Sequence, residues 1–312
     1  MCDLTLIVLT YNEEKHIERC LCSARGVADQ IFVVDSGSED CTVDIAKGIG
    51  AVVVQRAFTN QADQFQWALD NYAKHCGRTT EWIMRLDADE YATPELVSEI
   101  SRRLSDTPKE IVGFTVGRCV RFKGKPIYHG GHYQRPLRVW RHGRARMEER
   151  WMDEHVVLSE GNPEHLKGEI IDDNLNGITW WTDKHNRYAS REAVVLLDKK
   201  YKFMEKASGG NGRLAPQAKV NRWMKDRLYS RLPLGWRALG FYFYRMIFRL
   251  GFLDGRAGLV YHFLQGFWYR LLVDVKVWEV ERRMMREGID CIAAIREELG
   301  IEVGNGARGQ DG

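Results

Sequence analysis

Residues 4–35 read LTLIVLTYNEEKHIERCLCSARGVADQIFVVD, and they are the clearest indication of the fold class. Residues 4–10 form a short apolar run rich in β-branched side chains, which predicts a buried strand. Asn12 can cap a helix, because apolar residues recur at helical spacing from 17 to 24. Residues 30–34 repeat the strand pattern. A strand, a helix and a second strand at this spacing predict a parallel sheet covered by helices.

The alternation continues along the chain and then changes character. The next predicted elements are a helix at 40–47 capped by Asp40, a strand at 51–55, a helix at 63–75, a strand at 81–86 and a helix opened by Pro94. Extended segments at 111–122, 136–140 and 155–158 follow, and then a helix at 183–206. The sequence therefore predicts an α/β fold whose sheet is parallel in its first half and mixed in its second.

The composition is that of a globular protein. The 312 residues are 44% hydrophobic and 29% charged, which excludes a disordered, collagen-like or disulfide-scaffold protein. Seven scattered cysteines, none in a CxxC pair, predict reduced, buried thiols in a cytosolic compartment. The first residues carry no basic leader and no cleavage site, so export is not expected.

The charge is unevenly distributed. The net charge is +3, yet residues 213–286 hold fifteen Lys and Arg against five Asp and Glu, together with fifteen of the 34 aromatic residues. The glycine-rich stretch 208–212 precedes this region and is the best linker candidate. We therefore expect a first domain at 1–207, a basic aromatic helical extension at 213–303 and a flexible tail at 304–312.

The extension predicts a membrane-interfacial helical hairpin, with one helix at 235–249 and the other at 257–278. Its longest uncharged run has thirteen residues, short of the ~20 that span a bilayer. The residues expected to face lipid headgroups are Arg237, Arg245 and Arg249 in the first helix and Trp268, Tyr269 and Arg270 in the second. The alternative is that both helices pack on the first domain or on a sister subunit. Nucleic acid is not expected as a partner, because bulky aliphatic side chains outnumber lysines.

Polar turns follow three of the predicted strands, at residues 10–14, 35–40 and 87–90. Because the carboxyl ends of parallel strands meet at one edge of a sheet, these turns should converge on one ligand site. The chain has no GxxxxGK[ST] motif, and no GxGxxG follows one of these strands. A P-loop ATPase and a dinucleotide-binding Rossmann site are therefore disfavoured.

Asp87 and Asp89 are candidate metal ligands. Two residues apart at a strand end, they can direct both carboxylates to one cation, and hard carboxylate oxygens suit Mg²⁺ or Mn²⁺. A diphosphate could then bind through the metal. A bare DxD is more often a solvated loop, and the two neighbouring turns are what favour a metal site here. Tyr11 is either a core residue or a ring that stacks on a base.

Three motifs, TYNEE at 10–14, VVDSGSED at 33–40 and LDADE at 86–90, resemble those of the family 2 glycosyltransferases with the GT-A fold. WMDEH at 151–155 and KHNRYA at 184–189 resemble the bacterial branch that includes the lipopolysaccharide-core β-1,4-glucosyltransferases. The resemblance implies that residues 1–207 are a GT-A (Rossmann-like) catalytic domain, a mixed sheet flanked by helices that binds a nucleotide sugar.

The resemblance also implies a role for each matching residue. Thr10, Tyr11, Glu13 and Asp35 would hold the uridine, Asp87 would lie near the ribose and the metal, and Asp89 would ligate the metal. The branch tends to have a histidine where Asp172 aligns, so the third ligand would be Asp172, Asp173 or a solvent molecule.

Sugar transfer also needs a base for the acceptor hydroxyl. A carboxylate can serve on the face of the sugar opposite the leaving group, as the general base does in inverting glycosidases. We expect Glu154 to be this base, with Asp153 as the second candidate, because the branch has His-Glu at this position. Without the resemblance, the pair could be a solvated turn.

Other polar residues have simpler interpretations. His129 and His132 lack a nearby third ligand, so an acceptor-side loop is favoured over a zinc site. His185 is expected to be a structural histidine, while Lys184 or Arg187 could contact an acceptor phosphate.

Together these features predict an inverting, Mg²⁺- or Mn²⁺-dependent hexosyltransferase on the cytoplasmic face of a bacterial inner membrane. The expected donor is a UDP-sugar, the expected acceptor is a lipid-linked or lipopolysaccharide-type glycan, and the expected docking surface is an anionic membrane. One alternative is a polyprenyl-phosphate glycosyltransferase of the same fold, which needs no general base. The other is a non-catalytic nucleotide-binding membrane scaffold.

Overall fold

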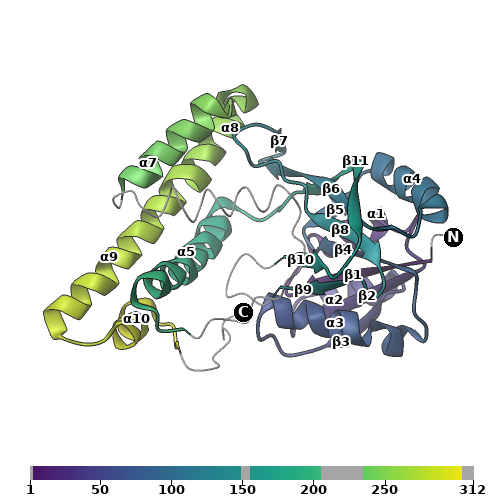
Figure 1. The fold of residues 1–312 in the computed structure, drawn as a ribbon, viewed down its shortest axis with the longest axis horizontal. Coiled ribbons are helices and arrows are strands. Elements are labelled where there is room, and N and C mark those ends of the chain that lie inside the picture. The colour runs from purple at the N-terminus through teal and green to yellow at the C-terminus, as the bar shows by residue number, and fades with distance from the viewer. Residues whose placement is uncertain (1–2, 149–154, 205–234, 304–312) are drawn as a thin grey trace.

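The computed structural model describes residues 3–148, 155–204 and 235–303. A sheet flanked by helices forms one part, and the C-terminal helices lie to one side of it together with α5 (Figure 1). The strands are β1 Leu4–Thr10, β2 Gln30–Asp35, β3 Val52–Gln55, β4 Trp82–Asp87, β5 Glu90–Ala92, β6 Ile111–Phe122, β7 Lys125–Ile127, β8 Leu137–Arg141, β9 Ala145–Met147, β10 Val156–Leu158 and β11 Asn162–Asp172. The α-helices are α1 Ile17–Ser23, α2 Thr42–Gly48, α3 Gln61–Cys76, α4 Pro94–Arg103, α5 Ile178–Tyr201, α7 Trp236–Phe243, α8 Gly255–His262, α9 Tyr269–Glu287 and α10 Cys291–Leu299.

The main sheet has the strand order β3-β2-β1-β4-β8-β6-β11-β5, with β7 paired to β6. The first four strands in this order are parallel, whereas β8 runs antiparallel to both of its neighbours. Thr10 pairs with Asp35 and Leu9 with Asp87, so β1, β2 and β4 end side by side. The α/β class, the parallel first half and the mixed second half are confirmed.

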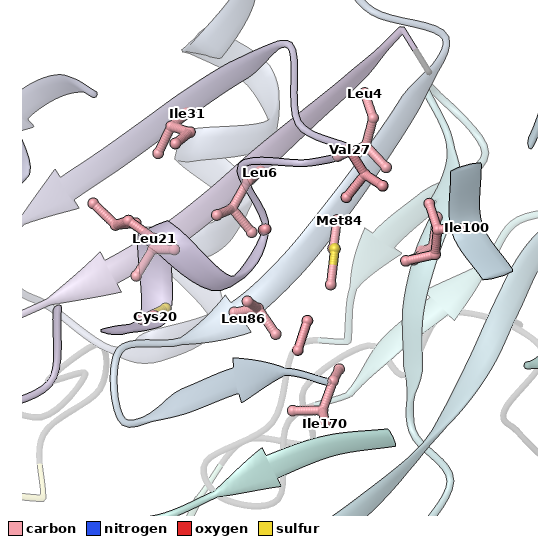
Figure 2. Packing of buried hydrophobic residues seen from close by; sticks show 14 of the residues in the cluster. Leu4, Leu6, Cys20, Leu21, Val27, Ile31, Met84, Leu86, Ile100 and Ile170 are labelled. Atoms are coloured by element: carbon pink, nitrogen blue, oxygen red, sulfur yellow. The ribbon is translucent and has the colours of Figure 1, made fainter. Parts of the chain in front are cut away.

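Hydrophobic layers cover both faces of the parallel strands. On one face, Leu6 and Met84 belong to the cluster that includes residues of α1 and α4 (Figure 2). On the other face, Ile7 and Phe32 belong to the cluster that includes Phe65 of α3. Successive strand residues point to opposite faces, and both faces are buried here. This is why the first strand reads as an almost continuous apolar run.

The first helix begins later than the sequence predicts. Asn12 does not cap it, because its φ of 52° places it in the left-handed region and its polar groups are used elsewhere. Its backbone N–H donates to Ser38 Oγ at 2.8 Å, and its Oδ1 accepts from the Glu39 N–H at 2.9 Å. The prediction was wrong because contacts with the second polar turn replace the local cap.

Two further expectations need correction. Cys22 and Cys41 are exposed, so these thiols are not buried, although all the described cysteines are free. The helix expected at 183–206 is α5, which spans Ile178–Tyr201. It ends where Lys202 adopts the left-handed conformation.

The C-terminal helices pack on α5 as well as on one another. Val273 and Val277 of α9 and Ile295 of α10 share a buried cluster with Ala193 and Leu197 of α5. The part of the predicted extension that the structure describes is therefore helical, and it packs on protein along this side. The linker expected at 208–212 lies outside the described residues. Among those that are described, no helix has the length and apolar character needed to cross a membrane.

The arginines expected to face lipid headgroups are turned inward at two positions. Arg237 is 5% exposed, and its Nε donates to Asp274 Oδ1 at 2.7 Å. Arg245 is 4% exposed, and its Nε donates to the Gly130 carbonyl at 2.9 Å. A buried guanidinium needs such acceptors, and the fold provides them. The prediction was wrong for both residues, whereas Phe243 between them is 49% exposed.

The second set of expected headgroup contacts also needs correction. Tyr269 is 6% exposed and donates from its hydroxyl to Glu192 Oε2 at 2.7 Å. Arg270 Nη1 donates to Glu192 Oε1 at 2.6 Å. Both residues therefore bind a carboxylate of α5, and Tyr269 is buried.

Candidate active site

The first two polar turns form a single unit at the carboxyl ends of β1 and β2. Beyond the Asn12 contacts, the Glu13 N–H donates to Thr42 Oγ1 at 2.7 Å. Thr10 is 4% exposed, and its buried hydroxyl has no hydrogen-bond partner among the described residues. Tyr11 is 43% exposed. At the predicted nucleotide site the unit thus carries an exposed aromatic ring and, directly before it in the chain, a buried hydroxyl without a partner among the described residues.

Asp35 shapes the second turn from its position at the end of β2. Its side chain is fully buried, and Oδ2 accepts from the backbone N–H groups of Gly37 and Ser38 at 3.0 and 2.9 Å. Oδ1 accepts from Ser38 Oγ at 2.5 Å. Asp35 is therefore occupied in holding its own turn, and its predicted contact with uridine stays a prediction.

Asp87 lies at the end of β4 among three arginines. Its Oδ1 accepts from Nε and Nη2 of Arg85 at 3.1 and 3.0 Å, and its Oδ2 lies 3.5 Å from Arg138 Nη2. Loss of solvent alone would raise the pKa of Asp87, but Arg85, Arg138 and Arg118 hold it well below the usual range. Asp87 is thus kept ionised.

Glu90 fixes the turn that carries Asp87 and Asp89. It is 1% exposed, and its Oε2 accepts from the Asp87 N–H at 3.0 Å. Its Oε1 accepts from Arg118 Nε at 2.8 Å and from Arg138 Nη2 at 2.6 Å. Burial raises the pKa of Glu90 to about 7, with Asp87 adding to the effect and both arginines opposing it.

Asp172 lies in the same site. It pairs with Glu90 between β11 and β5, and its carboxylate accepts a hydrogen bond from Arg118. Burial raises the pKa of Asp172 to about 6. The positive charge of Arg118 opposes this rise, and the negative charge of Asp89 adds to it. The neighbouring Asp173 is 7% exposed and accepts from Arg19 Nη1 at 2.9 Å. Both candidates for a third metal ligand are therefore engaged by arginines.

The loop after β11 holds Asp89 in place. Asn174 Nδ2 donates to Asp89 Oδ2 at 3.0 Å, and the Asp173 N–H donates to the Asp89 carbonyl at 3.1 Å. The Leu175 N–H donates to Nε2 of the buried His16 at 2.9 Å. Nδ1 of His16 must then carry the proton, and it lies 2.5 Å from Glu13 Oε2. His16 therefore links this loop to the first polar turn.

Lys184 brings a positive charge near these carboxylates from α5. Its Nζ lies 4.7 Å from the ring centroid of Trp180. Burial lowers the pKa of Lys184, but Tyr188, Asp89, Glu13 and Asp172 together raise it above its ordinary value. The ammonium group therefore remains charged.

The predicted bases, Asp153 and Glu154, lie outside the described residues, and their role stays a prediction. The expected acceptor-side loop packs against the extension, where His129 Nδ1 lies 2.7 Å from Asp254 Oδ1. Nδ1 of His132 lies 3.2 Å from Nη2 of Arg245. His185 stacks on Trp181, with ring centroids 3.5 Å apart, in agreement with a structural histidine.

Several site residues were missed in the sequence: His16, Arg19, Glu90, Arg118, Arg138 and Asn174. Two of them carried a signal. Arg118 and Arg138 interrupt apolar strand segments, and an arginine buried in a sheet requires a carboxylate partner. Asn174 and His16 gave none, because Asp89 lies 85 residues from Asn174 and the Leu175 N–H, which donates to His16, lies 159 residues away along the chain.

The carboxylates suit a divalent cation that is shared with a ligand. In the part of the chain that the structure describes, no three His, Cys, Asp or Glu side chains are arranged to enclose a metal. Mg²⁺ is commonly held by one or two carboxylates together with substrate phosphates and water. Asp89 fits this arrangement, because Asn174 occupies only Oδ2 and no described residue donates to Oδ1.

Residues 5–162 match the family model described as Glycosyl transferase family 2. An uncharacterized glycosyltransferase of Rickettsia bellii (strain RML369-C) is 37% identical over 97 residues, which are 31% of this chain and 31% of that protein. The SPbeta prophage-derived glycosyltransferase SunS of Bacillus subtilis (strain 168) is 29% identical over 149 residues, covering 43% of this chain and 35% of that protein. The matches thus span about a third of the length of these relatives.

A solved structure of glucosyl-3-phosphoglycerate synthase from Mycobacterium tuberculosis, in complex with Mn²⁺ and UDP-glucose, is 22% identical. The alignment covers 38% of this chain and 43% of that one, with a TM-score of 0.30. A likeness of this size does not identify a substrate. The family model, in contrast, spans just over half of the 312 residues and contains all three polar turns. The chain therefore belongs to glycosyl transferase family 2.

Proposed function

We propose that this protein is an inverting, metal-dependent glycosyltransferase, and that it moves a sugar from a UDP-sugar to a lipid-linked or lipopolysaccharide-type glycan. The observation that carries the proposal is the convergence of three polar turns at the ends of β1, β2 and β4. The turn after β1 carries the exposed Tyr11, the turn after β4 carries Asp87 and Asp89, and the buried hydroxyl of Thr10 at the end of β1 has no partner among the described residues. A nucleotide, a diphosphate and a cation all have suitable partners in this place.

The donor half of the proposal rests on charge. A nucleotide diphosphate leaves with developing negative charge, and a divalent cation bound at Asp89 would neutralise it as a Lewis acid. The contacts with Arg85 and Arg138 keep the Asp87 carboxylate ionised and hold the turn after β4 in place. Tyr11 offers a ring face to the uracil base.

The acceptor half rests on the proposed base. Glu154, with Asp153 as the second candidate, would take the proton of the acceptor hydroxyl. The hydroxyl oxygen would at the same time attack the anomeric carbon on the face opposite the diphosphate. Attack from that face inverts the anomeric configuration. The lipopolysaccharide-core β-1,4-glucosyltransferase branch is our expectation for the acceptor type.

We further propose that the C-terminal helices hold the enzyme on the cytoplasmic face of a bacterial inner membrane. The large apolar side chains exposed on α7, on α8 and between them are Trp236, Phe243, Ile247, Phe248, Leu250, Phe252, Leu253, Leu259 and Val260. Arg249 and Arg256 are exposed beside them and suit an anionic headgroup layer. With Arg237 and Arg245 turned inward, insertion of apolar side chains would supply most of the binding.

The test of the proposed reaction is UDP release. Purified full-length protein is incubated with a panel of UDP-sugars and other nucleotide sugars, Mg²⁺ or Mn²⁺ and a lipid extract that contains lipopolysaccharide precursors, and the released nucleotide is identified. The proposal predicts release of UDP that depends on one donor, on the metal and on the extract. Full activity in excess chelator would contradict the metal, and activity with only another nucleotide sugar would contradict the donor.

A further inference from the structure

The helix α5 presents two different faces. On one face, the stacked pair Trp181 and His185 contacts Trp268 and Tyr269, with ring centroids 6.2 and 5.7 Å apart. These contacts join α5 to the C-terminal helices. Since a helix turns by 100° per residue, Trp180 and Lys184 lie to one side of this packed face.

That second face carries an aromatic and basic row. Trp180, Lys184 and Tyr188 follow one another at intervals of four residues, so their side chains lie one above the other. Lys184 Nζ lies 4.7 Å from the Trp180 centroid and 5.9 Å from the Tyr188 centroid. Tyr188 is 37% exposed, and Trp180 is half-buried. Neither ring is fully buried in the hydrophobic core.

Among the described residues no carboxylate lies within 4 Å of Lys184 Nζ, although Asp89, Glu13 and Asp172 are near enough to raise its pKa, and the ammonium group lies against the two rings. A cation–π contact holds an ammonium group without neutralising it. Because α5 begins at Ile178, directly after the loop that holds Asp89, this charge lies near the predicted metal site. A charged lysine held between two rings is available to an anionic ligand.

We propose that Trp180, Lys184 and Tyr188 form a sugar-phosphate subsite, in which Lys184 Nζ pairs with a phosphate oxygen and the two rings pack on the sugar. Lysine binds phosphate as a compact point charge, and exposed aromatic rings offer an apolar face to the C–H groups of a pyranose. This inference rests on the proposed function. The phosphate belongs either to the donor diphosphate or to a phosphorylated acceptor sugar.

Two matched pairs of probes distinguish these sources by calorimetric titration of the full-length protein. UDP and uridine, each with Mn²⁺, differ only in the diphosphate. Glucose 1-phosphate and glucose, titrated into protein saturated with UDP and Mn²⁺, differ only in the phosphate. The variants are Lys184→Met, which keeps the aliphatic stem, Lys184→Arg, which keeps the charge, and Lys74→Met, the control, at an exposed lysine of α3.

Loss of one charged hydrogen bond should weaken phosphate binding roughly 10- to 100-fold. For a donor phosphate, Lys184→Met weakens UDP binding by this factor while uridine binding stays unchanged. For an acceptor phosphate, it weakens binding of glucose 1-phosphate and leaves UDP binding unchanged. Lys184→Arg should recover most of the affinity, and Lys74→Met should match the wild type.

The inference is overturned if wild-type protein binds UDP and Lys184→Met changes neither the affinity for UDP nor the affinity for glucose 1-phosphate. Wild-type protein that binds no UDP contradicts the proposed function, and this inference with it.

Discussion

Asn174 donates a hydrogen bond from Nδ2 to Asp89 Oδ2 across 3.0 Å, although 85 residues separate the two in the chain. The contact orients the Asp89 carboxylate and leaves Oδ1 without a donor among the described residues. It also joins the loop after β11 to the turn after β4. The candidate metal ligand is thus held by a segment that the DxD motif does not contain.

We predict that Asp89→Ala abolishes metal-dependent binding of UDP and release of UDP from the donor. The reason is that Asp89 is proposed to ligate the cation that bridges the diphosphate. Calorimetry with UDP and Mn²⁺ measures the first effect, and circular dichroism checks that the fold is kept. Asp44→Ala, at an exposed position in α2, is the matched control. Undiminished transfer by Asp89→Ala would remove Asp89 from the metal site.

Replacement of the proposed base should separate binding from catalysis. Glu154→Gln is expected to bind UDP and metal like the wild type but to lose rate by about 10²–10⁴, the usual contribution of a general base. Initial rates of UDP release with the acceptor measure this loss. If Asp153→Asn is inactive and Glu154→Gln is active, the two roles are exchanged. Full activity in both variants would favour a phosphate acceptor, which needs no base.

Glu90 should be essential for stability. Glu90→Gln leaves Arg118 and Arg138 without their shared carboxylate, and loss of one partner from a buried ion pair costs about 3–5 kcal/mol. The free energy of unfolding in urea measures this cost. Glu95→Gln, on the exposed side of α4, should change it by less than about 0.5 kcal/mol. Equal stability of the two variants would contradict the role given to Glu90.

Membrane binding should depend on exposed apolar side chains more than on charge. Phe248→Asp combined with Leu253→Asp is expected to reduce liposome binding by at least roughly 100-fold, because each buried side chain of this kind contributes about 1.5–3 kcal/mol. Flotation with anionic vesicles measures it, and Met285→Asp, at an exposed site near the end of α9, is the control. High salt should weaken the binding of wild-type protein without abolishing it.

Wild-type protein that stays in the soluble fraction at low salt would contradict the membrane proposal. Point variants are preferable to truncation after Gly212, because removal of α9 and α10 would expose the buried face of α5.

The stability of the protein should fall in mild acid because of His185. Burial lowers the pKa of His185 to about 4, whereas an unfolded histidine titrates near 6.5. The unfolded state therefore binds the proton more tightly, so stability is complete above pH 6.5 and declines as the pH falls toward 4. Between pH 6 and 5, His185→Gln should flatten the slope of unfolding free energy by up to about 1.4 kcal/mol per pH unit. An unchanged slope would contradict this assignment, and His75→Gln, at an exposed histidine of α3, is the control.

Much of the α/β part of the chain could be predicted from local sequence patterns. The first strand, the strand at 111–122 and the start of the helix at Pro94 were predicted closely, because apolar patterning and the helix-opening proline act over a few residues. The three polar turns could be placed together, since parallel strands end at the same edge. Asp87 and Asp89 were found for that reason.

The remaining features depend on contacts between distant residues. The capping prediction for Asn12 failed because Ser38 and Glu39 supply its partners. The prediction that Arg237 and Arg245 face outward failed because Asp274 and the Gly130 carbonyl accept hydrogen bonds from them. A helical wheel shows which residues share a face, but it does not show which face meets the protein.

Local sequence patterns are enough to predict the alternation of strands and helices and the acidic turns that carry the predicted chemistry. The groups that hold those turns, namely Glu90 between two arginines and Asn174 on Asp89, are seen only in the folded chain. The physical reason is that a buried polar group must find a partner, and in a folded chain that partner can lie at any sequence distance.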